Sequence, residues 1–318
     1  MAPLLIAYDG SPHADRAIMA AAALMPGRPV LVLTVWRSVR HAAASTRIAL
    51  PEDVIAGGVA ALDAEAQDEA SRLAEQGARL ARTSELQASA IAAQLHGSAA
   101  ATILTVADEH DASLVVVGSR GHSAVRSTIL GSVTYGLLHA TRRPTLVARD
   151  VAATDRPLPE GPVMLCYDGS PAARHAAEVA GGLLRGSRGL VVHCWEPIPD
   201  RLLRTASYPP LAPQLRDVAV TLNDADRELA ETVAAEGANV ARAAGFEATP
   251  RIVGEREGVW EALAGVAEDE DARLVVAGSR GRSAWSSLVI GSVSHGLLHH
   301  SSRPLLIVPP PEEPEARS

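Results

Sequence analysis

Leu114–Ser132 reads LVVVGSRGHSAVRSTILGS, and Leu274–Ser292 repeats it as LVVAGSRGRSAWSSLVIGS, 160 residues later. The apolar run that opens each copy is typical of a parallel strand buried on both faces. Both copies share the spacing Gly-x2-Gly-x9-Gly-Ser, and the final Gly-Ser pair opens a helical pattern. A strand, a glycine loop and a helix start in this order predict an α/β domain that is present twice.

A second matched pair lies near the start of each repeat. Leu4–Ser11 reads LLIAYDGS and Val163–Ser170 reads VMLCYDGS, 159 residues apart. A period near 160 residues is far longer than a solenoid repeat and has the size of a whole domain. We therefore expect two domains joined by a polar, proline-containing linker and followed by a disordered tail, with bounds of 1–150, 161–310, 151–160 for the linker and 311–318 for the tail.

Within each repeat, strand-like runs alternate with helical patterns, as expected of a parallel sheet with helices on both faces. After the first strand, Ser11-Pro12 and Ser170-Pro171 each supply a helix N-cap followed by proline at the first helical position. Strands are expected at 4–8, 30–36, 86–95, 114–118 and 145–149, and again at 163–167, 190–195, 247–253, 274–278 and 305–308.

The glycine loop predicts an anion site. Glycines let the backbone turn tightly and approach a ligand closely, and a helix N-terminus offers unpaired N–H groups that suit phosphate. The Ser132 hydroxyl could donate to a phosphate oxygen or cap the helix. The glycines could instead form turns only, but identical spacing in two copies favours binding, because mere turns tolerate drift. The candidates are Gly118, Gly121, Gly131 and Ser132, with Gly278, Gly281, Gly291 and Ser292 in the second repeat.

The spacing excludes two common phosphate motifs. The dinucleotide fingerprint needs three glycines within six residues, and a Walker loop needs Gly-Lys-Ser/Thr, whereas this chain contains no lysine. Phosphate charge would therefore be met by amides, hydroxyls and arginine. Arg120 and Arg280 lie inside the two loops and are candidates, with a solvated surface position as the alternative.

Asp9 and Asp168 end the first strand of each repeat, directly before a helix N-cap. A carboxylate at this place could accept hydrogen bonds from ribose hydroxyls or from an adenine amine. It could equally form a local Asx-type turn that starts the helix. The sequence leaves both interpretations open.

Composition narrows the class of protein. The net charge of −8 and the 3% aromatic content argue against nucleic acid as a partner, because such binding needs cations or stacking platforms. No apolar stretch approaches the roughly 20 residues that cross a bilayer, and no signal peptide is evident. Cys166 and Cys194 end two predicted strands and fit small core residues better than a disulfide framework. We expect a cytoplasmic protein without a membrane partner.

A metal centre is not expected. His295 and His299 have the i,i+4 spacing that can hold a metal on one helix face, but the first repeat has Tyr135 and His139 there and no third ligand is apparent.

With strand–Asp at the start, Gly-x2-Gly-x9-Gly-Ser near the end and a proline-led last strand, the chain resembles the universal stress protein family in both halves. The resemblance implies two tandem Rossmann-like domains of the adenine nucleotide alpha hydrolase-like type. Each would be a five-stranded parallel sheet of order 3-2-1-4-5. In that order strands 1 and 4 are neighbours, so Asp9 and Gly118 would face one cleft.

Members of that family with this glycine pattern bind ATP, which the resemblance extends to both repeats. Asp9 and Asp168 would contact the adenosine part, and Val35 and Cys194 would offer apolar contact or backbone groups to adenine. The glycines and serines above would hold the phosphates. A divalent ion, Mg²⁺ or Mn²⁺, would ride on the triphosphate, and the sequence shows no dedicated protein ligands for it.

The leading functional hypothesis is an ATP-binding, nucleotide-dependent stress-response regulator that forms a homodimer. Its downstream protein partner is not indicated by the sequence. A slow ATPase or a nucleotidyl-transferring enzyme on the same fold is the alternative. Fast hydrolysis needs a base or a positioned water, and no residue can be named for that role, so the sequence favours the regulator over the enzyme.

Overall fold

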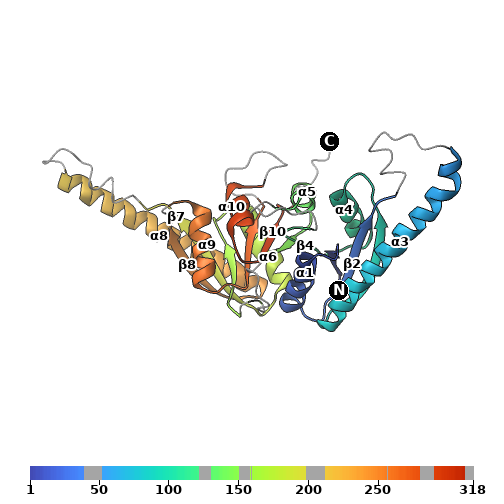
Figure 1. Ribbon diagram of the computed structural model, residues 1–318. Coiled ribbons are helices and arrows are strands. Elements are labelled where there is room, and N and C mark those ends of the chain that lie inside the picture. Colours follow the sequence, from blue (N-terminus) through green and yellow to red (C-terminus); the bar gives the residue numbers. More distant parts are fainter. Residues whose placement is uncertain are drawn as a thin grey trace, which may run out of the picture. The chain divides into compact units, whose positions relative to one another are not determined.

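A computed structural model (Figure 1) describes residues 1–38, 52–121, 130–149, 158, 160–197, 212–255, 257–279 and 290–311. Contacts divide the chain into two units, Met1–Leu158 with Pro304–Ile307 and Pro159–Arg303 with Val308–Ser318. The linker expected at 151–160 and the tail expected at 311–318 lie outside the described residues, apart from Leu158, Glu160 and Pro311.

The first unit has the predicted alternation of strands and helices. Its sheet has the order β3-β2-β1-β4-β5 with parallel neighbours, which confirms the expected order 3-2-1-4-5. Leu305–Ile307 also belongs to this unit and pairs antiparallel with Thr145–Val147. The elements are β1 (Leu4–Ala7), α1 (Pro12–Leu24), β2 (Pro29–Trp36), α3 (Glu52–Thr83), β3 (Gln87–Gln94), α4 (Ala99–Glu109), β4 (Leu114–Gly118), α5 (Ser132–Ala140) and β5 (Thr145–Ala148).

The second unit repeats this plan. Its first strand, β6, pairs in parallel with β7 and β9, and β7 pairs in parallel with β8. The elements are β6 (Val163–Cys166), α6 (Pro171–Leu183), β7 (Arg188–Trp195), α8 (Ala212–Ala244), β8 (Glu247–Gly254), α9 (Val259–Asp269), β9 (Leu274–Gly278) and α10 (Ser292–His300). β10 (Leu305–Val308) follows in the chain, and all of it except Val308 belongs to the first unit.

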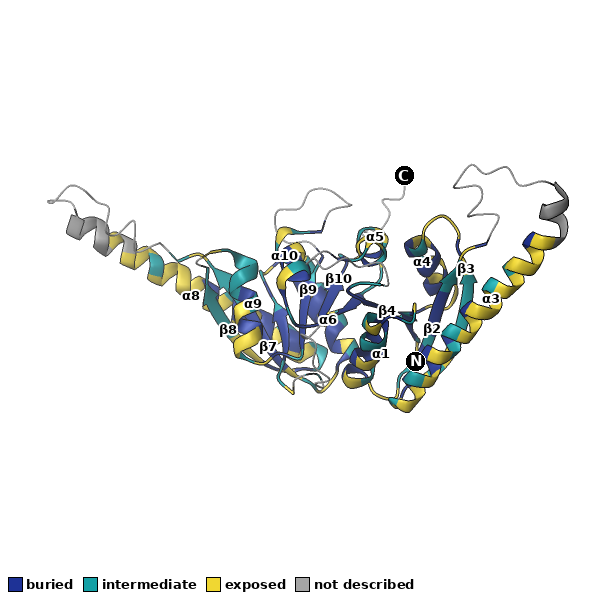
Figure 2. Ribbon diagram, in the orientation of Figure 1, coloured by how far each residue is buried: buried dark blue, intermediate teal, exposed yellow. Residues whose placement is uncertain are grey.

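The apolar runs form the core because their strands are covered on both faces. In Figure 2 the central strands are buried while the outer surfaces of the helices are exposed. β4 is buried along its whole length, as its unbroken apolar sequence predicts. Helix α1 starts as expected, because the Ser11 hydroxyl accepts a hydrogen bond from the Ala14 amide and Pro12 follows at the first helical position. The observed bounds differ from the expected ones by only one or two residues at several element ends.

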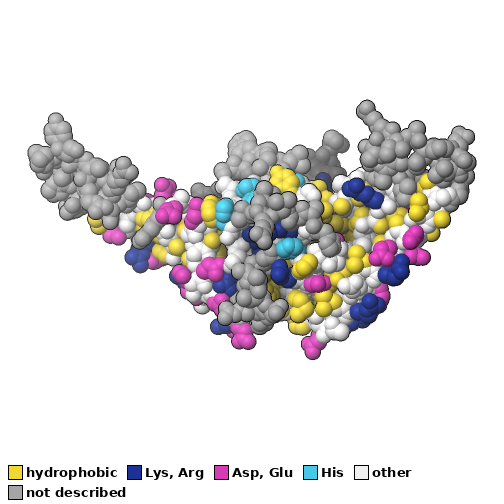
Figure 3. Space-filling view, in the orientation of Figure 1, with side chains coloured by type: hydrophobic (Ala, Val, Ile, Leu, Met, Phe, Trp, Pro, Cys, Tyr) yellow, Lys and Arg dark blue, Asp and Glu magenta, His cyan; other side chains and the backbone are white. Residues whose placement is uncertain are grey.

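The exposed surface of α3 carries charges of both signs. Figure 3 shows acidic and basic side chains interspersed along this helix. Arg72 pairs with Glu69, and Arg82 pairs with Glu75. Pairs of this kind add little stability at an exposed site, and they leave α3 without a uniformly basic surface.

A glycine in each long helix allows close packing against the strand end that leads to the predicted site. A Cβ at Gly77 would lie 2.8 Å from Cδ1 of Tyr8, and a Cβ at Gly237 would lie 2.6 Å from Cδ1 of Tyr167. Glycine inside a helix costs about 0.5–1 kcal/mol relative to alanine. Both helices nevertheless have glycine at these matched positions, because the tyrosine ring occupies the space that a larger side chain of the helix would need.

We predict that Gly77→Ala destabilises the first unit by about 1–3 kcal/mol, because the added methyl group overpacks the contact with Tyr8 and Val32. Urea denaturation followed by circular dichroism measures the shift in midpoint. The matched control is Gly58→Ala in the same helix, where the added carbon would meet no neighbouring segment within 4 Å among the described residues. That variant should be neutral or more stable by up to about 1 kcal/mol. An equal effect of both substitutions would contradict the packing account.

Candidate functional site

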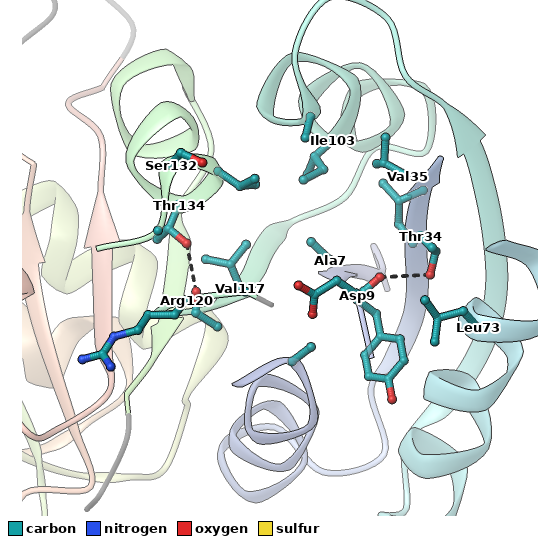
Figure 4. A pocket seen from close by; sticks show the side chains of 18 residues that line it. Ala7, Asp9, Thr34, Val35, Leu73, Ile103, Val117, Arg120, Ser132 and Thr134 are labelled. Atoms are coloured by element: carbon teal, nitrogen blue, oxygen red, sulfur yellow. Dashed lines mark hydrogen bonds between the residues drawn. The ribbon is translucent and has the colours of Figure 1, made fainter. Parts of the chain in front are cut away.

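A cleft of about 470 Å³ opens in the first unit at the carboxyl ends of β1 and β4. Since β1 and β4 are neighbours at the point where the strand order reverses, the chain leaves their ends in different directions. Figure 4 shows side chains from both sides of the sheet converging there. All seven residues singled out in the first repeat line this cleft, namely Asp9, Val35, Gly118, Arg120, Gly121, Gly131 and Ser132.

Two glycines permit close approach of the chain segments around the cleft. A Cβ at Gly118 would lie 2.7 Å from the carbonyl oxygen of His13, and a Cβ at Gly121 would lie 2.6 Å from Oδ2 of Asp9. The second contact joins the two sequence motifs, which are more than a hundred residues apart. The backbone of the glycine loop therefore passes directly beside the carboxylate that ends β1.

The Asp9 carboxylate forms the local turn that the sequence allowed, and it also lines the cleft. Its Oδ1 accepts a hydrogen bond from the Ser11 amide at 3.0 Å, which is the Asx-type turn before α1. Its Oδ2 is the atom beside Gly121. Figure 4 shows the carboxylate pointing into the space between Val117 and Thr34. The turn and a ligand contact are thus compatible in one side chain.

The start of α5 forms the side of the cleft opposite β2. The N-cap is Gly131, with no side-chain cap, so the Ser132 hydroxyl belongs to the first helical residue and does not cap the helix. The Gly131 amide donates to the Ser119 carbonyl at 2.9 Å, and Thr134 Oγ1 donates to the Gly118 carbonyl at 2.9 Å. These two bonds fix the N-terminus of α5 against the end of β4, with its first amides at the cleft.

The part of the cleft near β2 is apolar. Val35 lies at the end of β2, and Leu73 and Ile103 come from α3 and α4. Thr34 Oγ1 donates to the Tyr8 carbonyl at 3.0 Å and so links β2 to β1. One end of the cleft can therefore take a flat apolar group, while the other offers amides, a hydroxyl and an arginine.

Arg120 lines the polar end of the cleft, and His13 and Arg149 lie close enough to feel its charge. Burial lowers the pKa of His13, and the neighbouring Arg16 and Arg120 lower it further. Burial also lowers the pKa of Arg149 to about 10, with Arg120 as the next cause. Arg149 is still protonated at neutral pH.

The second unit keeps much of this geometry in its described part. The Asp168 Oδ1 accepts from the Ser170 amide at 3.0 Å, the Gly291 amide donates to the Ser279 carbonyl at 2.8 Å, and Ser294 Oγ donates to the Gly278 carbonyl at 2.6 Å. Ser292 is the first residue of α10 and Cys194 lies at the end of β7. Arg280 and Gly281, both predicted site residues, lie outside the described residues.

Cys166 and Cys194 stand where the first unit has Ala7 and Val35, two residues that line its cleft. Burial raises the pKa of the Cys166 thiol to about 12 and that of the Cys194 thiol to about 11. Both thiols are therefore protonated at neutral pH, and each can act as a small, weakly polar group.

Sequence reasoning missed several residues that form the cleft, among them Tyr8, Thr34, Leu73, Ile103 and Thr134. Two of them had a signal. Tyr8 recurs as Tyr167, and Thr134 has a hydroxyl counterpart in Ser294. Leu73 and Ile103 gave none, because only the packing of α3 and α4 brings them to the cleft.

Among the described residues, no three His, Cys, Asp or Glu side chains are grouped so that they could hold a metal ion. Every described helix is too short or too polar to span a lipid bilayer.

Comparison with known proteins agrees with this architecture. A sequence profile described as the Universal stress protein family matches residues 1–149 and 161–309. A universal stress protein of Mycolicibacterium smegmatis is 29% identical over 96% of this chain and 97% of its own length. Another, from Mycobacterium tuberculosis, is 30% identical over 62% of each chain. The crystal structure of a universal stress protein from Archaeoglobus fulgidus has a TM-score of 0.63 at 18% identity, and the match covers 97% of this chain and 98% of that one. At this level of identity the similarity supports the fold and no more.

We predict that Cys166 and Cys194 react with iodoacetamide at pH 8 at least tenfold more slowly than free cysteine. A thiol of pKa about 11 is only about 0.1% thiolate at that pH, whereas an ordinary one is about a quarter thiolate. Mass spectrometry over time measures the rates, and the protein in 8 M urea is the control that should react at the ordinary rate. Alkylation of the folded protein as fast as free cysteine would contradict the raised pKa values.

Proposed function

The chain belongs to the universal stress protein family, and from that premise we propose that it binds ATP and acts as a nucleotide-dependent stress-response regulator. The observation that carries the proposal is the meeting of Asp9, the Gly118–Gly121 turn and the start of α5 around one cleft. These three features come from distant parts of the sequence. Each one alone could be a local turn, but together they leave space for a ligand with one apolar and one anionic end.

The residues that line the cleft suit an adenine nucleotide in one orientation, with the base at the apolar end and the phosphates at the start of α5. Val35, Leu73 and Ile103 provide the apolar side for the base, and Asp9 can accept hydrogen bonds from sugar hydroxyls or from an exocyclic amine. The amides of α5 from Ser132 onward lie at the helix N-terminus, at the phosphate end, whereas the Gly131 amide already donates to the Ser119 carbonyl. In a chain without lysine, these amides, the Ser132 hydroxyl and Arg120 would neutralise the phosphates.

The same arrangement in the second unit supports two nucleotide sites per chain. Asp168, Gly278, Gly291 and Ser292 occupy the matched strand and helix ends, and Cys194 replaces Val35 with another small side chain. A Mg²⁺ or Mn²⁺ ion would be held by the phosphates themselves. We also propose that the protein is cytoplasmic, where thiols stay reduced, in keeping with two cysteines that form no disulfide. The family resemblance supports a homodimer.

A regulator needs its ligand to favour one conformation or one partner complex over another. The cleft is lined by residues of the glycine loop and of α4. A ligand that contacts both segments would therefore favour the conformation in which they lie at the right distance to bind it. The downstream protein partner would then bind one of the two conformations more tightly than the other. This role requires retention of the nucleotide and does not require its cleavage.

Slow ATP hydrolysis or nucleotidyl transfer is the second candidate. In the described lining of the cleft the only carboxylate is Asp9, and its Oδ1 already accepts the Ser11 amide. Tyr8 is a poor base, because burial and its hydrogen bond to Asp15 raise the pKa of its hydroxyl. The described residues thus favour binding over rapid catalysis.

We predict that Gly121→Val weakens ATP binding by the first unit at least tenfold. The new side chain would begin 2.6 Å from Asp9 Oδ2 and would displace the carboxylate while narrowing the cleft. Photolabelling with 8-azido-ATP, followed by peptide mapping, measures binding to each unit separately.

The matched control is Gly58→Val, at an exposed position of α3 where the new carbon would contact no other segment within 4 Å in the described part of the chain. It should leave labelling unchanged. Equal labelling of first-unit peptides in the wild type and Gly121→Val, with excess unlabelled ATP removing the label in both, would overturn the site assignment.

We predict single-turnover hydrolysis of labelled ATP slower than about 10⁻³ s⁻¹, the order of an NTPase that lacks its activating arginine. Rapid quenching and thin-layer separation of the products give the rate. A rate above about 0.1 s⁻¹ would favour the enzyme and would count against the regulator.

A further inference from the structure

The N-terminal half of α8 carries an apolar stripe on its exposed surface. Its members follow one another at intervals of four, three and four residues, which places them within about 60° of the helix circumference. Leu222 and Leu229 are 54% and 64% exposed. The whole stripe, all of it exposed, consists of Val218, Leu222, Ala225 and Leu229.

The residues by which α8 packs on its own sheet lie on a different face of the helix. This helix contacts β7 and β8, and its buried alanines lie about 140° around the helix from the stripe. These alanines are Ala230, Ala234, Ala238 and Ala241. Figure 1 shows the N-terminal half of α8 extending beyond β7 and β8. The sheet of the second unit therefore leaves the stripe uncovered.

Exposed apolar side chains are concentrated in this short segment. Of the eight large apolar side chains that are exposed among the described residues, four lie between Val218 and Leu229. Three of these four belong to the stripe, and Val220 lies on the opposite side of the helix. Single exposed apolar residues are ordinary, whereas a group along one face of a helix marks a place where another molecule binds.

The first unit lacks this stripe, although α3 corresponds to α8 in fold. The two helices are aligned by Gly77 and Gly237, which pack against tyrosine rings in the same way. In this alignment Leu62 matches Leu222, but the other three positions of the stripe are Gly58, Glu65 and Glu69 in α3. The fold therefore does not require apolar residues at these positions, and their presence in α8 needs another reason.

The charged side chains beside the stripe are acidic. Asp226 lies along one side of it and Glu228 along the other, and both are exposed. Arg227 lies on the opposite side of α8, where it pairs with Glu231 at 3.1 Å. Figure 3 shows apolar and acidic side chains together along the described part of α8. These carboxylates would attract a partner with basic side chains and would repel an anionic lipid surface or a second acidic helix.

We infer that the stripe of α8 binds an amphipathic helix of another protein, in which arginine or lysine flanks the apolar side chains. The intervals along the stripe are those by which one helix packs against another. The stripe is about 16 Å long, so it suits about three turns of a partner helix. An interface of this size is typical of a transient complex, with a Kd of about 1–100 μM. The inference does not depend on nucleotide binding.

The experiment measures binding of two model peptides to the full chain by fluorescence anisotropy. The first is a fluorescein-labelled peptide of three heptads with leucine at the a and d positions, arginine at e and g, and alanine elsewhere. The second has glutamate in place of arginine. The basic peptide should bind with a Kd of about 1–100 μM, and the acidic peptide should bind at least about tenfold more weakly because its charges meet Asp226 and Glu228.

Variants of the protein separate the apolar part of the interaction from the charged part. Leu222→Ser with Leu229→Ser should weaken binding of the basic peptide at least about tenfold, because apolar burial is lost while the charge of the protein is unchanged. Leu62→Ser, at the matching position of α3, is the control and should leave binding unchanged. Asp226→Asn with Glu228→Gln should reduce the difference between the two peptides at least about threefold.

Failure of the wild type to bind the basic peptide would overturn the inference, and so would equally tight binding by the double serine variant. Two further measurements test other occupants of the stripe. If sedimentation velocity shows a wild-type dimer that the double serine variant no longer forms, a second copy of the chain covers the stripe. If urea denaturation shows a lower midpoint for that variant, another segment of the same chain covers it. Either result would also overturn the inference.

Discussion

The reversal of strand order between β1 and β4 is the constraint on which the site depends. Because these strands are parallel neighbours, Asp9 and Gly118 leave the sheet at the same edge while their following segments diverge. The gap between the segments becomes a cleft. Hydrogen bonds from Gly131 to Ser119 and from Thr134 to Gly118 then hold the start of α5 at that gap. Without this register, the glycines and the carboxylate would be unrelated turns.

Much of the fold was predictable because the chain carries its pattern twice. Unbroken apolar runs marked β1 and β4, and the Ser-Pro pairs marked the starts of α1 and α6. The repeated glycine spacing placed the turn and the start of α5 correctly. These features are local, so their residue types alone determine them.

Other features depend on tertiary register and could not be predicted. Nothing in the sequence of α3 indicates that Gly77 must make room for the ring of Tyr8. Thr134 matters only because its hydroxyl reaches the Gly118 carbonyl across the end of the sheet. Arg149 was expected as the last residue of a strand, but β5 ends at Ala148 and leaves Arg149 beside the loop of β4. Its relation to Arg120 arises from the pairing of two strands.

Above all, we propose that main-chain amides at the glycine loop and at the start of α5 bind phosphate. Hydrogen exchange followed by mass spectrometry, with and without saturating ATP, tests this claim most directly. Slower exchange in peptides that contain Gly118–Gly121 and Gly131–Thr134, with little change in α3, is the predicted result. Unchanged exchange at both segments, under conditions where ATP is shown to be bound, would contradict the claim.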